Sequence, residues 1–279
     1  MKTKLIAVLT GLLLVSNAFA TGSKDTNTGS TSQSTGKAPY TIEVGGSTSV
    51  TPLMEQLAAE YQKTNSHIKV NINGTGSGDG IKNAGVMYQI GMSSRELTPA
   101  EQGAGLKEII IAIDGIAVIV HKDNPVADLS IEQIRGIYTG AITDWSQVTG
   151  AAKKGQIAVV SREEGSGTRG AFEELVGFQG KLLAGANEST STGAIKAGIA
   201  QNPDAIGYIS LGSVDDTVKA VAVGGVSATN ENVANLSYKI ARPFIVLTGS
   251  SIHPESTAFL NWIQGSNGKE IIKKGYVLP

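Results

Sequence analysis

A strand followed by a turn rich in glycine and hydroxyl side chains, and then by a helix, recurs three times in this chain and constrains its fold more than any other feature. The turns comprise residues 45–49, 74–80 and 165–168, which read GGSTS, GTGSGDG and GSGT. An apolar run leads into each turn, and a helical segment follows it. Alternating strands and helices predict α/β sheets that are mainly parallel, with these turns at the strand ends where open sheets bind ligands.

The third turn has the chemistry of an anion site. It belongs to the stretch 161–172, SREEGSGTRGAF. The first N–H groups of a helix have no partner within the helix, and they lie at the positive end of its dipole. Arg162, at the end of the preceding strand, adds a planar set of donors that suits an oxyanion. We therefore expect a small, desolvated anion at this turn, and the alternative is an ordinary tight turn with a capped helix.

The same stretch also matches a dinucleotide-binding pattern, because the glycines of 165–170 have the spacing G-x-G-x-x-G. Ser166, Thr168 and Arg169 crowd this loop and suit a small anion better than a pyrophosphate. A nucleotide-dependent enzyme that uses 165–170 is the alternative. The sequence has no G-x-S-x-G nucleophile motif and no pairing of a histidine with a serine. We therefore predict no enzymatic activity, no catalytic residue, no cofactor and no metal.

Charge and cysteine usage exclude several other classes. The net charge is −1 over 279 residues, which does not favour binding to nucleic acid or to an anionic membrane surface. The sequence contains no cysteine, so disulfides, thiolate catalysis and cysteine–zinc sites are excluded.

Residues 1–20 are predicted to be a signal peptide, with Lys2 and Lys4 before an apolar stretch and Ala18-Phe19-Ala20 as the cleavage motif. Residues 21–39 are rich in Thr, Ser and Gly and are predicted to form a flexible tether. We expect an exported protein, periplasmic or on the outer cell surface. The N-terminus resembles that of a lipoprotein, but Thr21 stands where the lipid-bearing cysteine would be.

Two apolar segments, 108–120 and 238–247, are predicted to cross between two domains. They divide the folded part into lobe I (40–116 and 241–279) and lobe II (117–240). Gly115 suggests a bend within the first segment. Asp114 beside it needs a buried partner, because an unpaired carboxylate is costly in apolar surroundings. A cleft between the lobes would bring the three turns together.

Five motifs occur in one order: GGSTSVTP, GTGSG, IGMSSR, REEGSGTR and AIGY. Together they resemble the phosphate-binding proteins of bacterial phosphate ABC transporters, which have the type II periplasmic-binding-protein fold. The resemblance covers about residue 40 to the C-terminus. It implies two α/β lobes, each a mainly parallel sheet flanked by helices, that close on one phosphate in the cleft. It also implies a monomer that delivers phosphate to a membrane ABC permease without catalysis.

The resemblance implies a set of phosphate-binding residues when it is carried over position by position. From the two turns of lobe I and the turn of lobe II these are Thr48, Ser49, Ser77, Arg162, Ser166, Gly167 and Thr168. Glu164 resembles the acidic residue that holds the arginine in place.

One position departs from the family. Many members carry an Asp where this sequence has Ser94. In them the Asp accepts the proton of phosphate and thereby excludes sulfate, because like charges repel. Asp114 and Asp79 are candidates for the missing acceptor, and Asp114 is preferred for its apolar setting, so Ser94 and Asp114 join the predicted site. Arg95 could add a positive charge. A receptor for another oxyanion, such as sulfate or molybdate, is the alternative function.

Overall fold

The structure is a computed structural model that describes residues 37–150 and 152–279. The predicted signal peptide and residues 21–36 of the predicted tether lie outside the described residues. None of the described helices has the length and apolarity needed to span a membrane.

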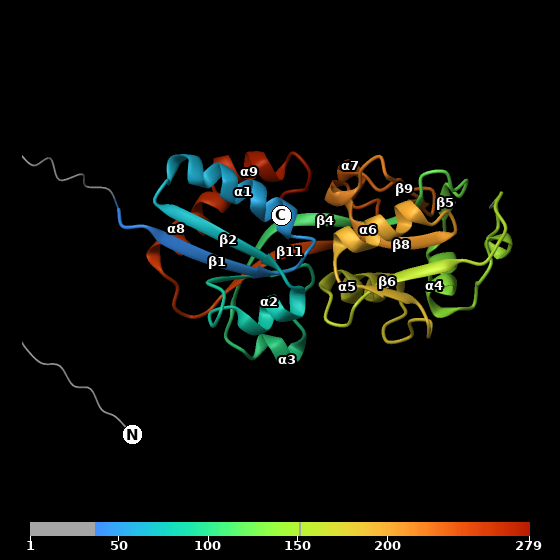
Figure 1. Ribbon diagram of the computed structural model, residues 1–279, viewed down its shortest axis with the longest axis horizontal. Coiled ribbons are helices and arrows are strands. Elements are labelled where there is room, and N and C mark those ends of the chain that lie inside the picture. Colours follow the sequence, from blue (N-terminus) through green and yellow to red (C-terminus); the bar gives the residue numbers. More distant parts are fainter. Residues whose placement is uncertain (1–36, 151) are drawn as a thin grey trace, which may run out of the picture. The chain divides into compact units, whose positions relative to one another are not determined.

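Strands and helices alternate through most of the described chain (Figure 1), as the sequence predicts. The strands are β1 (Tyr40–Gly46), β2 (Ile68–Gly74), β3 (Ile90–Ser93), β4 (Lys107–His121), β5 (Asp128–Leu129), β6 (Ala158–Arg162), β7 (Asn187–Ser189), β8 (Ala205–Ser210), β9 (Val218–Ala220), β10 (Ala222–Val223) and β11 (Ala241–Thr248). The helices are α1 (Thr51–Thr64), α2 (Ser77–Asn83), α3 (Pro99–Gln102), α4 (Ile131–Thr139), α5 (Gly167–Val176), α6 (Thr192–Gln201), α7 (Asn230–Ala234), α8 (Pro254–Gln264) and α9 (Ser266–Ile272). Two 3₁₀ turns, η1 (Trp145–Gln147) and η2 (Leu211–Ser213), complete the set.

One curled sheet runs in the order β2-β1-β3-β11-β4-β8-β6-β7, and β9 pairs with β4. β1 is parallel to both β2 and β3, and β6 is parallel to both β7 and β8. β11 and β4 lie in the middle and are antiparallel to their neighbours. The fold is therefore α/β with two mainly parallel halves that are joined by two antiparallel strands.

The long strand β4 changes partners at its centre. Its residues up to Gly115 pair with β11, and those from Ile116 onward pair with β8. β4 continues through Gly115, and the change of partner falls directly after this glycine. A Cβ at this glycine would lie 3.0 Å from Cγ2 of Val233. Close packing against α7 therefore accounts for the glycine.

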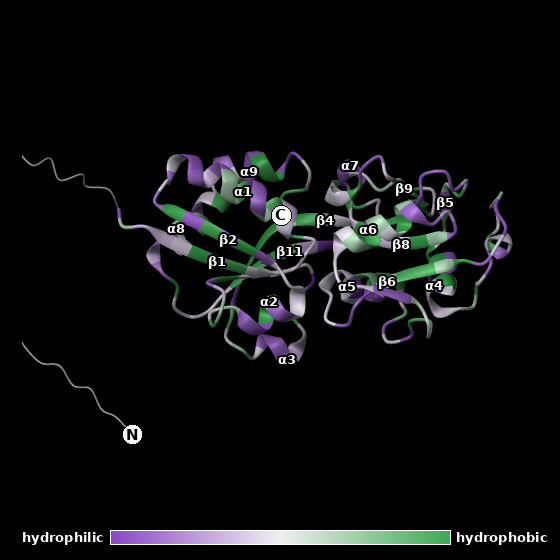
Figure 2. Cartoon of the chain, viewed as in Figure 1, coloured by the Kyte–Doolittle hydropathy of each residue, from purple (hydrophilic) through white to green (hydrophobic). Residues whose placement is uncertain are grey.

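Separate apolar clusters lie on the two sides of this change of partner. One cluster, which includes Val44, Leu57 and Phe244, packs α1, α8 and α9 against the first parallel half. A second, larger cluster includes Trp145 and Phe172 and fills the other half. Strands β6 and β8 of the second half are largely apolar in colour (Figure 2). Because the apolar clusters of the two halves are separate and β4 and β11 join the halves, the fold is two-lobed, as predicted.

Candidate anion-binding site

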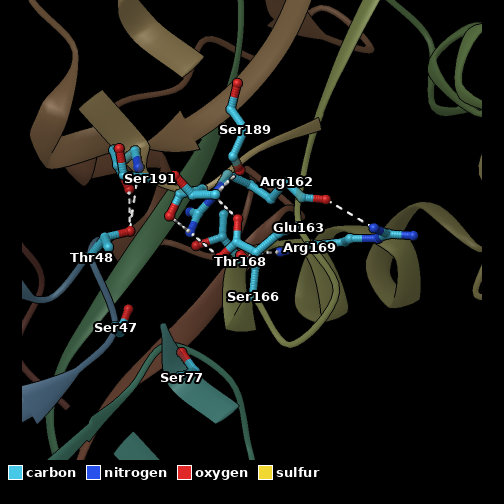
Figure 3. A network of polar contacts seen from close by, with 12 residues as sticks. Ser47, Thr48, Ser77, Arg162, Glu163, Ser166, Thr168, Arg169, Ser189 and Ser191 are labelled. Atoms are coloured by element: carbon cyan, nitrogen blue, oxygen red, sulfur yellow. Dashed lines mark hydrogen bonds and ion pairs between the residues drawn. The ribbon is translucent and has the colours of Figure 1, made fainter. Parts of the chain in front are cut away.

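Four helices begin at the junction of the two halves, and their first residues carry hydroxyl groups. Figure 3 shows Thr48 and Ser77, before α1 and at the start of α2, close to Ser166 and Thr168 of α5 and to Ser191 before α6. Each of these helices directs the positive end of its dipole toward the junction. The three glycine-rich turns therefore converge, as the sequence analysis expects, and the turn before α6 joins them.

The hydroxyls form one connected, buried cluster, in which each residue is at most 5% exposed. Oγ of Ser49 lies 2.9 Å from Oγ1 of Thr168 and 2.9 Å from Oγ1 of Thr192. Oγ of Ser94 lies 3.2 Å from Oγ of Ser77 and 3.5 Å from Oγ1 of Thr168. We call these five residues the hydroxyl cluster. It contains four of the predicted site residues, and Thr192 is an addition.

Two further predicted residues lie at the edge of the cluster. Oγ1 of Thr48 is 3.3 Å from Oγ1 of Thr192. It also accepts a hydrogen bond from the backbone N–H of Thr192. Gly167 lies against the other lobe: a Cβ there would collide with Oγ of Ser77 and lie 2.8 Å from Oγ of Ser94. Only glycine permits this approach.

The start of α1 differs from what its local sequence predicts. Thr51 followed by Pro52 predicts Thr51 as the N-cap, but the helix begins at Thr51 and Val50 takes the cap position. The chain already turns one residue earlier, because the carbonyl of Ser47 accepts the N–H groups of Val50 and Thr51. The hydroxyls of Thr48 and Ser49 are therefore not used to cap the helix.

Ser166 is the N-cap of α5, and its Oγ accepts the N–H of Arg169 at 3.3 Å. This bond uses a lone pair of the hydroxyl and leaves its proton for another partner. A capped helix and an anion site are thus compatible at this turn.

Arg162 is buried and paired with a neighbouring carboxylate. Its Nε and Nη2 donate to the two carboxylate oxygens of Glu163 at 2.9 and 2.8 Å, and Nε also donates to the carbonyl of Ser189. The prediction that Glu164 holds this arginine in place is wrong. Glu164 is exposed and lies in the turn that leads to Gly165, whose φ of 86° directs the chain away from the strand.

Asp114 has the buried partner that its apolar setting predicts. Nε and Nη2 of Arg242 donate to its Oδ2 at 3.2 and 3.1 Å, and Ser210 donates to its Oδ1 at 2.8 Å. Burial raises the pKa of Asp114 to about 6, and the charge of Arg242 opposes this rise. Nη1 of Arg242 donates to the carbonyl of Ser94 and to Oγ1 of Thr168. The guanidinium therefore lies between Asp114 and the hydroxyl cluster.

Arg242 and Thr192 are absent from the predicted site, although both carry a signal in the sequence. Arg242 is a charge in an apolar strand, and the argument applied to Asp114 applies to it equally. Thr192 ends the run 189–192, STST, before a helix. This run is a fourth hydroxyl-rich turn after a strand.

Two charged residues named in the sequence analysis have partners of their own. Asp79 accepts hydrogen bonds from Thr75, Asn83 and Tyr88, and these bonds, that from Thr75 above all, lower its pKa. Arg95 forms a bidentate pair with Glu101 at 2.7 and 2.8 Å. It lines a neighbouring groove of about 650 Å³.

Comparison with known proteins places the chain in a family. The model of the PBP superfamily domain matches residues 25–267, and the chain belongs to this superfamily. Within it, the chain belongs to the family of phosphate-binding proteins PstS. It is 30% identical over 247 residues to the PstS of Bacillus subtilis, covering 86% of this chain and 81% of that protein. It is 28% identical to the PstS of Borreliella burgdorferi, covering 84% of this chain and 88% of that protein.

Solved structures agree with this assignment. A substrate-binding protein from Clostridium perfringens, crystallised with bound phosphate, is 45% identical with a TM-score of 0.83. The comparison covers 86% of this chain and 99% of that one. An ABC-type phosphate transport receptor from Vibrio cholerae is 37% identical with a TM-score of 0.70, covering 85% of this chain and all of that one.

Proposed function

We propose that this protein is a solute-binding protein that captures inorganic phosphate between its two lobes and delivers it to an ABC permease. The observation that carries this proposal is the convergence of a buried hydroxyl cluster, a buried arginine and the starts of four helices at one place. Such a site offers donors and positive potential, and these are what a tetrahedral oxyanion requires. The relatives named phosphate-binding proteins support phosphate as that oxyanion.

The proposed ligand donors come from both lobes. Lobe I contributes Thr48, Ser49, Ser77 and Ser94, and lobe II contributes Arg162, Ser166, Gly167, Thr168 and the additional Thr192. Since hydroxyls of the two lobes are hydrogen-bonded to one another, we expect phosphate to replace some of these bonds and to bridge the lobes. Phosphate would then favour the closed state over the open state, because the closed state binds the anion more tightly.

The lobe boundaries proposed for this motion are those of the sequence analysis, 40–116 with 241–279 and 117–240. They are supported by the change of partner of β4 after Gly115 and by the separate apolar clusters on either side. The lobes would rotate about β4 and β11, the two strands that join them. The residues described here form one compact unit, in which such a rotation would open the hydroxyl cluster.

The wider role proposed here is binding without chemical conversion, by an exported monomer that docks on its permease when closed. Gly167 lies directly against the hydroxyls of the other lobe, which suits a small anion. A pyrophosphate would need more room at the same turn, so the nucleotide alternative is disfavoured.

Calorimetric titration of the ligand-stripped protein with phosphate tests the proposal. We expect saturable binding of one phosphate per chain. Sulfate and molybdate are titrated in parallel, and tighter binding of either would favour the alternative oxyanion receptor. No binding of any of the three anions would contradict the proposed function.

A further inference from the structure

Phosphate and sulfate are tetrahedral anions of similar size that differ in one respect: near neutral pH phosphate retains a proton and sulfate has none. A site selects phosphate when it holds an acceptor for that proton, because the same acceptor repels an unprotonated oxyanion. The identity of this acceptor deepens the proposed function and rests on it. Asp114 is the acceptor that the sequence favours, but its hydrogen-bond partners in the structure argue against it.

The hydroxyls near the site are arranged mainly to donate. Oγ of Ser77 accepts the backbone N–H of Ser94 at 3.1 Å. Ser166 accepts an N–H through its cap, and Oγ1 of Thr168 accepts Nη1 of Arg242 at 3.1 Å. In each case an N–H group that can only donate occupies a lone pair, and the hydroxyl proton is left to point elsewhere. The protons of these hydroxyls suit the bare oxygens of an anion, and a carboxylate, which only accepts when it is ionised, suits the protonated oxygen.

Asp114 and Asp79 are poorly placed for this task. Both oxygens of Asp114 already accept hydrogen bonds from the protein, and the guanidinium of Arg242 lies between it and the hydroxyl cluster. The carboxylate of Asp79 accepts three hydrogen bonds from its own segment, 75–88. Both carboxylates are therefore held within the fold, whereas a hydrogen bond from the anion needs a carboxylate that faces the junction of the lobes.

Glu163 is placed differently. Its two oxygens each accept one N–H of Arg162, and each retains a second lone pair. Its side chain is 26% exposed, and its Oε1 lies 3.7 Å from where a Cβ on Gly76 would be. The carboxylate therefore faces the glycine-rich turn of lobe I, across the junction from its own lobe. In Figure 3 it lies among Arg162, Ser166 and Thr168.

We propose that Glu163 accepts the proton of bound phosphate and thereby selects phosphate over sulfate. Arg162 has two functions in this arrangement: it attracts the anion, and it orients the carboxylate beside it. Since Glu163 and Gly76 belong to different lobes, the acceptor reaches the anion together with the donors of lobe I when the lobes close.

Calorimetric titration of the whole protein and its Glu163→Gln variant with phosphate and with sulfate tests this assignment. We expect the ratio of phosphate to sulfate affinity to fall by about tenfold or more in the variant, the scale of one hydrogen bond to a charged group. Glu164→Gln is the matched control, because it removes the adjacent exposed carboxylate, and its ratio should equal that of the unaltered protein.

A purely structural role of Glu163, through its pairing with Arg162, would weaken both anions equally. An unchanged ratio would therefore overturn the assignment. If the ratio of phosphate to sulfate affinity fell in Asp114→Asn but not in Glu163→Gln, the acceptor would be Asp114 and not Glu163. If the unaltered protein bound no phosphate at all, the proposed function itself would fail, which is a different outcome from an unchanged ratio.

A second variant serves if Glu163→Gln does not fold. Glu163→Ala removes the same carboxylate from a side chain that is partly exposed, so the ratio of phosphate to sulfate affinity should again fall. An unchanged ratio in this variant would overturn the assignment.

Discussion

Two buried arginines lie beside the hydroxyl cluster, and their partners differ. The side chains of Arg162 and Arg242 are each 2% exposed, but Glu163 beside the first is 26% exposed, whereas Asp114 beside the second is 1% exposed. The first pair follows a strand end and faces the junction of the lobes. The second joins β4 to β11 inside the sheet. The exposure of the carboxylate, more than that of the arginine, separates a pair that can respond to a ligand from one that supports the fold.

Arg242→Ala should give the largest effect, and on stability. Removal of one partner from a buried pair leaves an uncompensated charge, which costs about 3–5 kcal/mol of unfolding free energy. Urea denaturation without ligand measures this loss. The double variant Asp114→Leu with Arg242→Met is the control, because it removes both charges and should recover much of the stability. If the single variant lost less than about 1 kcal/mol of unfolding free energy, the pair would behave as one that is exposed to solvent.

Arg162→Ala should act mainly on binding. We expect phosphate affinity to fall by about 2–5 kcal/mol, the scale for removing one partner from a buried interaction between charges. The loss of stability without ligand should be smaller than for Arg242→Ala, because Glu163 is partly exposed to water. Calorimetry and urea denaturation of the two variants side by side check both parts. The proposed difference between the two pairs would be contradicted if Arg162→Ala destabilised the protein as much as Arg242→Ala does and left phosphate binding unchanged.

Gly167→Ala probes the approach of the two lobes without altering a charge. The added methyl group would collide with Oγ of Ser77, so we expect weaker phosphate binding by about 1–3 kcal/mol, as for an overpacked site. Gly193→Ala is the matched control in the first turn of α6, where a Cβ would meet no atom within 4 Å. Equal affinities of the two variants would mean that closure on phosphate does not bring Gly167 against Ser77.

Another arginine pair, Arg95 with Glu101, extends the comparison to a more exposed site, and its removal should have the smallest effect. The hydrogen bonds of Arg95 lower the pKa of Glu101 from 4.5 to about 2. A lowered pKa stabilises the folded state above about 4.5, and this contribution is lost as the pH falls toward 2. Glu101→Gln should therefore cost about 1 kcal/mol or less near neutral pH, since solvent screens the pair.

Urea denaturation across pH checks this last prediction. The stability difference between Glu101→Gln and the unaltered protein should shrink as the pH falls below about 4.5. Glu101 also accepts the backbone N–H of Thr98, the N-cap residue of α3. A difference that is constant with pH would mean that Glu101 acts through this hydrogen bond and not through its charge.

Much of the candidate site could be predicted from local patterns in the sequence. The glycine and hydroxyl turns 45–49, 74–80 and 165–168 are local features, because the start of a helix presents its N–H groups wherever it lies. The same holds for Asp114, whose need for a partner follows from its apolar neighbours alone. The α/β class and the need for a cleft could thus be predicted from the chain order.

What the sequence by itself determined was the alternation of strands and helices, the anion-seeking turns and the family to which they point. Tertiary structure alone decided which partners the charges take. Arg242 meets Asp114 across 128 residues, and Glu163 rather than Glu164 turns toward Arg162. The physical reason is that turns and helix starts depend on neighbours in the chain, whereas a buried ion pair depends on which strands the sheet places side by side.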